Sequence, residues 1–174
     1  MTVNTSYGQL SAPATLTIQR RLPGPIERVW AYLTDAELRK QWLADGAMTL
    51  KAGTTFELVW RNDTLSASPA ERPEGFAEEG RATCQMLECV PMQRLRFAWP
   101  GCGEVSWALQ PEGDGVLLTV THTQLPNRDM TLMVGAGWHM HLDILVARCE
   151  ERPPASFWQG WVQLRADYDQ HLTT

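Results

Sequence analysis

The sequence predicts an α+β fold, in which a curved antiparallel sheet of about six strands wraps onto one long helix. Between residues 14 and 123 most segments alternate apolar and polar residues, which is the period of strands with one buried face. Short turn signals, such as Glu-Gly-Asp-Gly at 112–115, join consecutive segments and favour antiparallel pairing. The longest helical pattern, residues 135–152, follows the strands and is the element long enough to cover their apolar face.

The chain of 174 residues, 44% of them hydrophobic, suffices for one domain with its own core. We expect a flexible tail over 1–13 and a single domain over 14–174, with 152–174 forming an extra C-terminal helix. The net charge of −5 argues against nucleic-acid binding, because a basic face is needed to replace condensed counterions.

The sequence contains no run of eighteen apolar residues that could span a membrane, and its first residues do not resemble a signal peptide. We therefore expect a cytoplasmic protein without a membrane partner. The four cysteines lack C-x-x-C spacing, and in a reducing compartment they are expected to be buried or partly buried thiols: Cys84, Cys89, Cys102 and Cys149.

Before the long helix, we expect one strand, then two short helices, and then five further strands. A strand begins at Ala14, and Pro25 suits the first turn of a helix over 26–33, since its missing N–H would be unpaired there. A second short helix covers 36–43. Residues 61–79 form a long polar loop of a length that is often mobile or functional. The other strands are expected at 54–60, 80–90, 93–99, 104–110 and 115–123.

The long helix is expected to open at Gly135 and Gly137 and to end before Pro153, since proline cannot continue a helix. A last helix follows over 153–172. It carries Trp158 and Trp161, which are more apolar surface than one contact stripe needs, so a homodimer through this helix is an open alternative.

The eight tryptophans suggest that the inner face of the sheet and the long helix enclose an aromatic pocket. A filled core explains the same residues equally well. If the pocket exists, His122, His141 and Asn62 would supply its few polar groups. The candidate ligand-binding residues are Phe56, Leu58, Trp60, Phe97, Trp99, Val105, Trp107, Leu118, Val120, His122, Trp138, His141, Leu142 and Leu145.

Among polar residues, His122 ends an inward-facing row and is the candidate catalytic residue, either as a general base or to orient a carbonyl. A hydrogen-bonded, structural histidine is the favoured alternative. His139 and His141 point to different sides of a helix and cannot ligate one metal, while His139 and Asp143 would form an exposed pair. Phosphate-loop and nucleophile-elbow motifs are absent, so we expect no cofactor and no metal, and an enzyme is less favoured than a binding protein.

Four segments carry a resemblance to a known family: LPGPIERVWAYLTDAELRKQWL, MLECVPMQRLRFAW, GEVSWALQPEGDGVLLTVTHTQLP and AGWHMHLDILVARCE. In this order they resemble the START/Bet v 1-like (SRPBCC) superfamily, and most closely the branch related to the activator of the heat-shock-protein-90 ATPase. The resemblance implies a helix-grip fold with a hydrophobic cavity between sheet and long helix.

Members of this superfamily bind apolar molecules, act as enzymes or bind protein partners, so fold alone leaves function open. Three hypotheses follow. The first is non-catalytic binding of a small hydrophobic or aromatic molecule. The second, implied by the resemblance only, is a co-chaperone-like interaction domain with a chaperone partner. The third is a cavity enzyme, such as a cyclase or hydrolase, that uses His122.

Overall fold

The computed structural model describes residues 2–172 and is built on a seven-stranded antiparallel sheet with the order β1-β2-β7-β6-β5-β4-β3. The predicted α+β class and the helix-grip arrangement are confirmed. The strands are β1 (Gln9–Ala12), β2 (Thr15–Pro23), β3 (Thr55–Trp60), β4 (Gly80–Val90), β5 (Arg94–Trp99), β6 (Gly103–Glu112) and β7 (Gly115–Thr123). The helices are α1 (Ile26–Thr34), α2 (Ala36–Arg39), α3 (Arg128–Cys149) and α4 (Phe157–His171), with 3₁₀ turns η1 (Val3–Thr5), η2 (Asn62–Leu65) and η3 (Pro69–Glu71).

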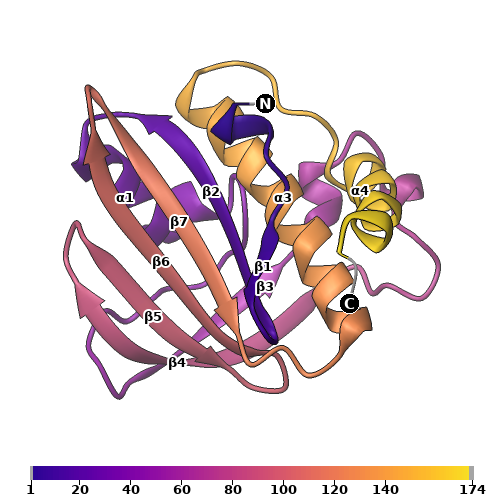
Figure 1. Cartoon of the computed structure of the whole chain (residues 1–174), viewed down its shortest axis with the longest axis horizontal. Coiled ribbons are helices and arrows are strands. Elements are labelled where there is room, and N and C mark those ends of the chain that lie inside the picture. The colour runs from indigo at the N-terminus through magenta and orange to yellow at the C-terminus, as the bar shows by residue number, and fades with distance from the viewer. Residues whose placement is uncertain (1, 173–174) are drawn as a thin grey trace.

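The sheet, α3 and α4 lie in that order across the molecule (Figure 1). The curved sheet holds one face against α3, which packs on β2, and α4 packs on α3 on the side away from the strands. The short helices α1 and α2 follow β2 and pack on each other, and α1 also contacts β7. Among residues 2–172, no helix combines the length and apolar character needed to cross a membrane.

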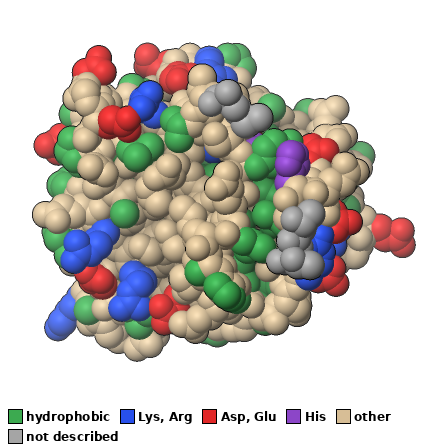
Figure 2. All heavy atoms as spheres, viewed as in Figure 1, with side chains coloured by type: hydrophobic (Ala, Val, Ile, Leu, Met, Phe, Trp, Pro, Cys, Tyr) green, Lys and Arg blue, Asp and Glu red, His purple; other side chains and the backbone are tan. Residues whose placement is uncertain are grey.

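The two-residue period of the strands explains which face is buried. In β7 the residues Val116, Leu118, Val120 and His122 are buried, and the threonines between them face outward. The face seen in Figure 2 agrees with this alternation, because the part over the sheet is mostly backbone and uncharged polar atoms, with charged side chains nearer its margin. Burial of one apolar face against α3 therefore sets the register of the sheet.

The N-terminal residues differ from the expected flexible tail. Gln9–Ala12 form β1, which pairs with β2 and adds the strand that the sequence did not predict. The side chain of Asn4 accepts from the backbone N–H of Arg21 at 2.6 Å and donates to its carbonyl at 3.0 Å. The Gly8 N–H donates to the hydroxyl of Tyr168 at 2.7 Å. A strand of four residues is too short to show a clear alternation of apolar and polar residues, so β1 forms because it pairs with β2. Met1, Thr173 and Thr174 of the predicted tail and domain lie outside the described residues.

The long helix begins earlier than the sequence indicated. It starts at Arg128, where the Asn127 side chain caps the helix by accepting from the Met130 N–H at 2.9 Å, and it ends at Cys149 rather than at residue 152. Gly135 and Gly137 are therefore inside the helix. Glycine is a poor helix former, which made these positions resemble a start, but tertiary packing of α3 overrides that preference.

One inward position of β2 carries a charge. Arg20 is fully buried, and its guanidinium donates to the Asp143 carboxylate on α3 from Nε at 3.3 Å and Nη2 at 3.2 Å. Its Nη1 donates to the carbonyls of Ser6 at 2.9 Å and Val3 at 3.3 Å. This single side chain therefore ties the N-terminal residues, the sheet and α3 together.

Candidate ligand-binding site

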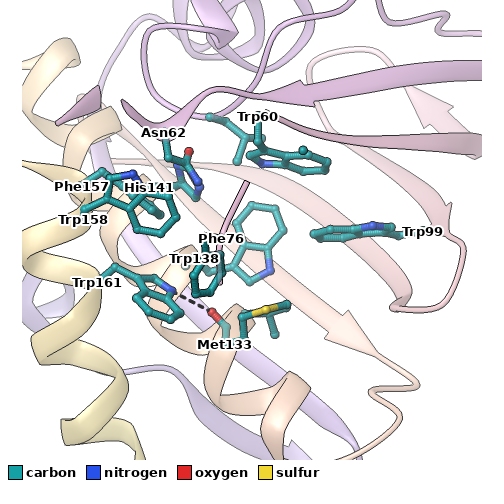
Figure 3. A pocket seen from close by; sticks show the side chains of 14 residues that line it. Trp60, Asn62, Phe76, Trp99, Met133, Trp138, His141, Phe157, Trp158 and Trp161 are labelled. Carbon is teal, nitrogen blue, oxygen red and sulfur yellow. Dashed lines mark hydrogen bonds between the residues drawn. The ribbon is translucent and has the colours of Figure 1, made fainter. Parts of the chain in front are cut away.

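A cavity of about 240 Å³ lies where α3, α4, the ends of β3 and β5 and the loop after β3 meet (Figure 3). Fourteen residues line it, and all but two are apolar or glycine. The sheet contributes Trp60, the last residue of β3, and Trp99, the last residue of β5. Their rings stack with centroids 4.9 Å apart and an angle of 14° between planes. Gly80 of β4 pairs with Trp60 of β3 and lines the cavity without adding a side chain.

Helix α3 presents one face to the cavity, formed by residues three, four and seven positions apart. These residues are Met133, Val134, Gly137, Trp138 and His141. At Gly137 a β-carbon would have no described atom within 4 Å, so the space above this glycine is part of the cavity. Glycine inside a helix costs about 1 kcal/mol relative to alanine, and at this position the effect is to leave the cavity open.

Helix α4 and the loop over 61–79 close the remaining sides. The cavity wall receives Phe157, Trp158 and Trp161 from α4, and Phe76 from the loop. The ring of Phe76 lies 5.2 Å from Trp158 and 5.1 Å from Trp161, measured between centroids, and is 37% exposed. The loop is attached to α4 because Asp63 accepts from the Trp158 indole at 2.9 Å. The loop that the sequence marked as potentially functional is therefore one wall of the site.

Four side-chain N–H groups of the wall donate within the protein, on Trp138, His141, Trp158 and Trp161. The indole N–H of Trp138 donates to His122 at 3.0 Å, and that of Trp161 donates to the Met133 carbonyl at 3.2 Å. His141 bonds through Nδ1 to the Trp42 carbonyl at 2.8 Å, and its ring packs against the tilted ring of Phe157 with centroids 4.4 Å apart. A carbonyl only accepts, so Nδ1 carries the proton and Nε2 presents a lone pair.

Asn62 is the other polar residue of the wall. It is the first residue of η2, and its side-chain oxygen is buried without a hydrogen-bond partner among residues 2–172. In Figure 3 Asn62 and His141 lie toward the α4 side of the cavity, and Trp99 lies on the opposite side. The cavity therefore has a polar end and an aromatic end.

Of the fourteen candidate residues, the structure brings four to this cavity: Trp60, Trp99, Trp138 and His141. The other ten are buried in the shared core, and none of them is among the residues that line the cavity: Phe56, Leu58, Phe97, Val105, Trp107, Leu118, Val120, His122, Leu142 and Leu145. Both alternatives expected from the sequence, a pocket and a filled core, are therefore present in different parts of the molecule. The middle of the sheet is filled, and the space lies at the ends of β3 and β5.

His122 is fully enclosed, and both of its ring nitrogens are engaged. Nδ1 accepts from the Trp138 indole, and Nε2 donates to the Cys102 carbonyl. Burial lowers the pKa of this imidazole, and the bond to the Cys102 carbonyl acts in the opposite direction. These contacts correspond to the structural alternative, since general-base catalysis would need a free nitrogen facing a substrate.

His139 and Asp143 do not form the exposed pair that their spacing suggested. His139 is buried, with Nδ1 at 2.8 Å from the Tyr168 hydroxyl and Nε2 at 3.6 Å from Asp143. Burial raises the pKa of the Asp143 carboxyl, while Arg20 acts against this effect. The packing of α4 on α3 buries His139, which no pattern within α3 could show, while the Asp143 side chain stays 37% exposed. Within residues 2–172, no group of three His, Cys, Asp or Glu side chains is placed to hold a metal ion.

The sequence reasoning missed nine wall residues, of which all but Gly80 of β4 lie outside the strands: Leu43, Phe76, Gly80, Met133, Val134, Gly137, Phe157, Trp158 and Trp161. Two signals were present. Phe76 is an isolated aromatic residue in a long polar loop, and Phe157, Trp158 and Trp161 form a dense aromatic group. Trp158 and Trp161 are buried inside the chain, so they do not supply the spare apolar surface that suggested a homodimer.

His141 is expected to make the fold less stable as the pH falls. Burial lowers the pKa of its imidazole from 6.5 to about 4, and the bond to the Trp42 carbonyl acts against this. Between these values the unfolded chain binds the proton and the folded chain does not. The free energy of unfolding should therefore decrease as the pH falls from about 6.5 to about 4, by up to about 3 kcal/mol in total.

The measurement is urea unfolding at several pH values across this window. The control is His141→Asn, whose amide can still donate to the Trp42 carbonyl but does not titrate. Its stability should decline less steeply than that of the wild type. Equal slopes would show that His141 is not the group responsible.

A family model described as "Activator of Hsp90 ATPase homolog 1-like protein" matches residues 23–150, which include most of the sheet and all of α3. The chain belongs to this family. Among curated proteins, none matches this member of the Activator of Hsp90 ATPase homolog 1-like family. The resemblance noted in the sequence is thereby confirmed at the level of the SRPBCC superfamily and of this branch.

Solved structures extend the likeness of this family member to nearly the whole chain. A protein of Bordetella parapertussis has 38% identity and a TM-score of 0.79, over 92% of this chain and 87% of that one. CalU16 of Micromonospora echinospora has 24% identity and a TM-score of 0.67, over 97% of each chain. The Aha1 dimer of Colwellia psychrerythraea has 15% identity and a TM-score of 0.59, over 78% of this chain and 96% of that one. The latter two likenesses support the fold.

Proposed function

We propose that this member of the Activator of Hsp90 ATPase homolog 1-like family binds a small hydrophobic or aromatic molecule without catalysis. The observation that carries the proposal is the cavity of about 240 Å³ between α3, α4 and the ends of β3 and β5. Its wall contains five tryptophans and two phenylalanines, among them Trp60, Trp99 and Trp138. Ligand sites are typically concave and apolar with a few polar groups, and this wall has that composition.

The size of the cavity limits the ligand. An engineered apolar cavity of about 150 Å³ accepts benzene, so a cavity of 240 Å³ has room for roughly ten carbon atoms. A flat molecule of two fused rings fits this volume, and it could pack against the stacked rings of Trp60 and Trp99. Such contacts give aromatic ligands an advantage over aliphatic ligands of equal size.

Non-catalytic binding is supported by the side chains that meet the cavity. Its described wall contains no carboxylate, lysine, serine, threonine or cysteine, and His141 is its one titratable residue. His122, the candidate catalytic residue, lies behind Trp138 and is held by two hydrogen bonds. An acid–base mechanism would need a second group of shifted pKa beside the first, and the wall does not supply one.

The proposal is tested by titrating the isotope-labelled protein with naphthalene and following backbone amide shifts by NMR. We expect saturable shifts confined to residues around the cavity, including the amides of Gly80 and Gly137, and native mass spectrometry should detect a one-to-one complex. Decane, which is of similar carbon count but cannot stack, should bind more weakly. Absence of saturable shifts with any two-ring compound would refute the proposal.

An alternative function is a co-chaperone-like interaction. The family to which the chain belongs favours it, and so does the likeness to the Aha1 dimer of Colwellia psychrerythraea. A purified heat-shock chaperone should then hydrolyse ATP faster when this protein is added. An unchanged ATPase rate together with no complex in size-exclusion chromatography would rule it out. A homodimer, the state of the Colwellia psychrerythraea protein, would be detected in the same chromatography.

A further inference from the structure

The polar end of the cavity offers two hydrogen-bond acceptors, the side-chain amide N–H groups of Asn62 and no charge. It is formed by Asn62 on η2 and His141 on α3, the two polar side chains of the wall. Both are held close to the first turn of α4. Asp63, the neighbour of Asn62 in the chain, accepts a hydrogen bond from the Trp158 indole. The ring of Phe157, the first residue of α4, packs against the ring of His141.

Asn62 contributes a carbonyl oxygen that is enclosed and has no partner within residues 2–172. A buried polar atom without a hydrogen bond costs about 1–3 kcal/mol, and such atoms are few in folded proteins. A ligand that donates a hydrogen bond to this oxygen would remove that cost. The unpaired atom thus points to a donor on whatever fills the cavity.

His141 contributes a second acceptor because its tautomer is defined. Nδ1–H donates to the Trp42 carbonyl, so Nε2 can only accept as long as the ring is neutral. The lowered pKa of about 4 keeps the ring neutral at physiological pH. A ligand oxygen that only accepts, as in an ether or a carboxylate, therefore cannot bond to Nε2.

The other polar groups of the wall are indole N–H groups, and three of the five are already engaged. The indole N–H groups of Trp138, Trp158 and Trp161 already donate within the protein. Trp60 and Trp99 are half-buried at the aromatic end. None of the residues known to line the cavity is lysine or arginine, so an anionic ligand would be buried without a counter-charge.

We propose that the cavity selects a neutral aromatic molecule of about two rings that carries a hydroxyl group, which donates its one proton to the unpaired side-chain oxygen of Asn62, beside the second acceptor on His141. This inference rests on the proposed function, because it names the chemical class of the ligand for the same site. The rings pack on the tryptophans, and the hydroxyl group lies at the polar end. An aromatic ether of the same size can accept from the Asn62 amide but leaves the Asn62 oxygen unpaired, and an aromatic carboxylate would be buried without a counter-charge, so both are disfavoured.

The test compares four probes of one ring system by NMR titration at about pH 7: 2-naphthol, 2-methoxynaphthalene, naphthalene and 2-naphthoate. We expect 2-naphthol to bind roughly tenfold more tightly than naphthalene and 2-methoxynaphthalene, and 2-naphthoate to bind most weakly. If 2-methoxynaphthalene or 2-naphthoate binds as tightly as 2-naphthol, the inference is overturned and the proposed function stands. If none of the four binds, the proposed function itself fails.

The variant Asn62→Leu assigns the preference to a residue. It keeps a side chain of similar size and removes the acceptor, so 2-naphthol should lose most of its advantage while naphthalene keeps its affinity. Gln163→Leu, the same amide-to-leucine change at an exposed position of α4 outside the cavity wall, should leave both affinities unchanged. An undiminished advantage for 2-naphthol in folded Asn62→Leu would overturn the role of Asn62. If that variant does not fold, the four-probe comparison on the wild type still decides the inference.

Discussion

Replacing Gly137 with leucine is expected to abolish binding of two-ring ligands without unfolding the protein. A β-carbon at this position has no described atom within 4 Å, so the longer side chain can enter the cavity without a collision at its base. Leucine is also a better helix former than glycine by about 1 kcal/mol. The four added carbon atoms occupy much of the space for roughly ten, so affinity should fall by about 100-fold or more.

The measurement is an NMR titration with 2-naphthol, accompanied by urea unfolding of each variant. Gly137→Ala should keep most of the affinity and raise the free energy of unfolding by about 0.5–1 kcal/mol. Gly135→Ala is the matched control, because its β-carbon would lie 3.5 Å from the Tyr168 ring, an ordinary contact outside the cavity wall. Undiminished binding to Gly137→Leu would place the ligand elsewhere on the protein.

Arg20→Met is expected to destabilise the fold by about 3 kcal/mol, the low end for removing one partner of a buried ion pair, because Arg20 is fully buried but the Asp143 side chain is 37% exposed. The change leaves the Asp143 carboxylate without its cation and the carbonyls of Val3 and Ser6 without their donor. Burial already raises the pKa of Asp143, so losing the nearby guanidinium raises it further. Part of the loss should come from the N-terminal residues separating from the sheet.

The free energy of unfolding in urea measures the total loss, and hydrogen exchange at the Gly8 amide measures the separation of the N-terminal residues. Arg21→Met is the matched control, since the adjacent arginine is exposed and pairs with Glu112 at the surface. It should change stability by less than about 1 kcal/mol. Adding Asp143→Asn to Arg20→Met should restore part of the stability. Equal losses in the two single variants would contradict a structural role for the buried pair.

The strands, the helices and the covering of one sheet face could be predicted because each depends on a period within a short segment. Leu118, Val120 and His122 alternate with threonines, and every second residue of a strand faces the same way. The boundaries were less certain. Gly135 and Gly137 indicated a helix start, yet α3 begins at Arg128 because contacts with the sheet and α4 stabilise the added turns.

The cavity was predicted in kind but only partly in place. Trp60, Trp99, Trp138 and His141 were identified, whereas the wall from α4 and the loop was not. These parts meet through pairs such as Asp63 with Trp158, which are 95 positions apart in sequence. A period reports which residues share a face, but it does not report which distant segment packs on that face.

The fold class, the family and the aromatic composition of the interior follow from the amino-acid sequence alone, because periodicity, turns and residue type are local properties. The tertiary structure decided which aromatic residues fill the core and which leave space. It also decided that His122 is enclosed while His141 and Asn62 reach a cavity. The physical reason is that space and unpaired polar atoms arise where several elements fail to fill a common volume. That outcome depends on all of their positions at once.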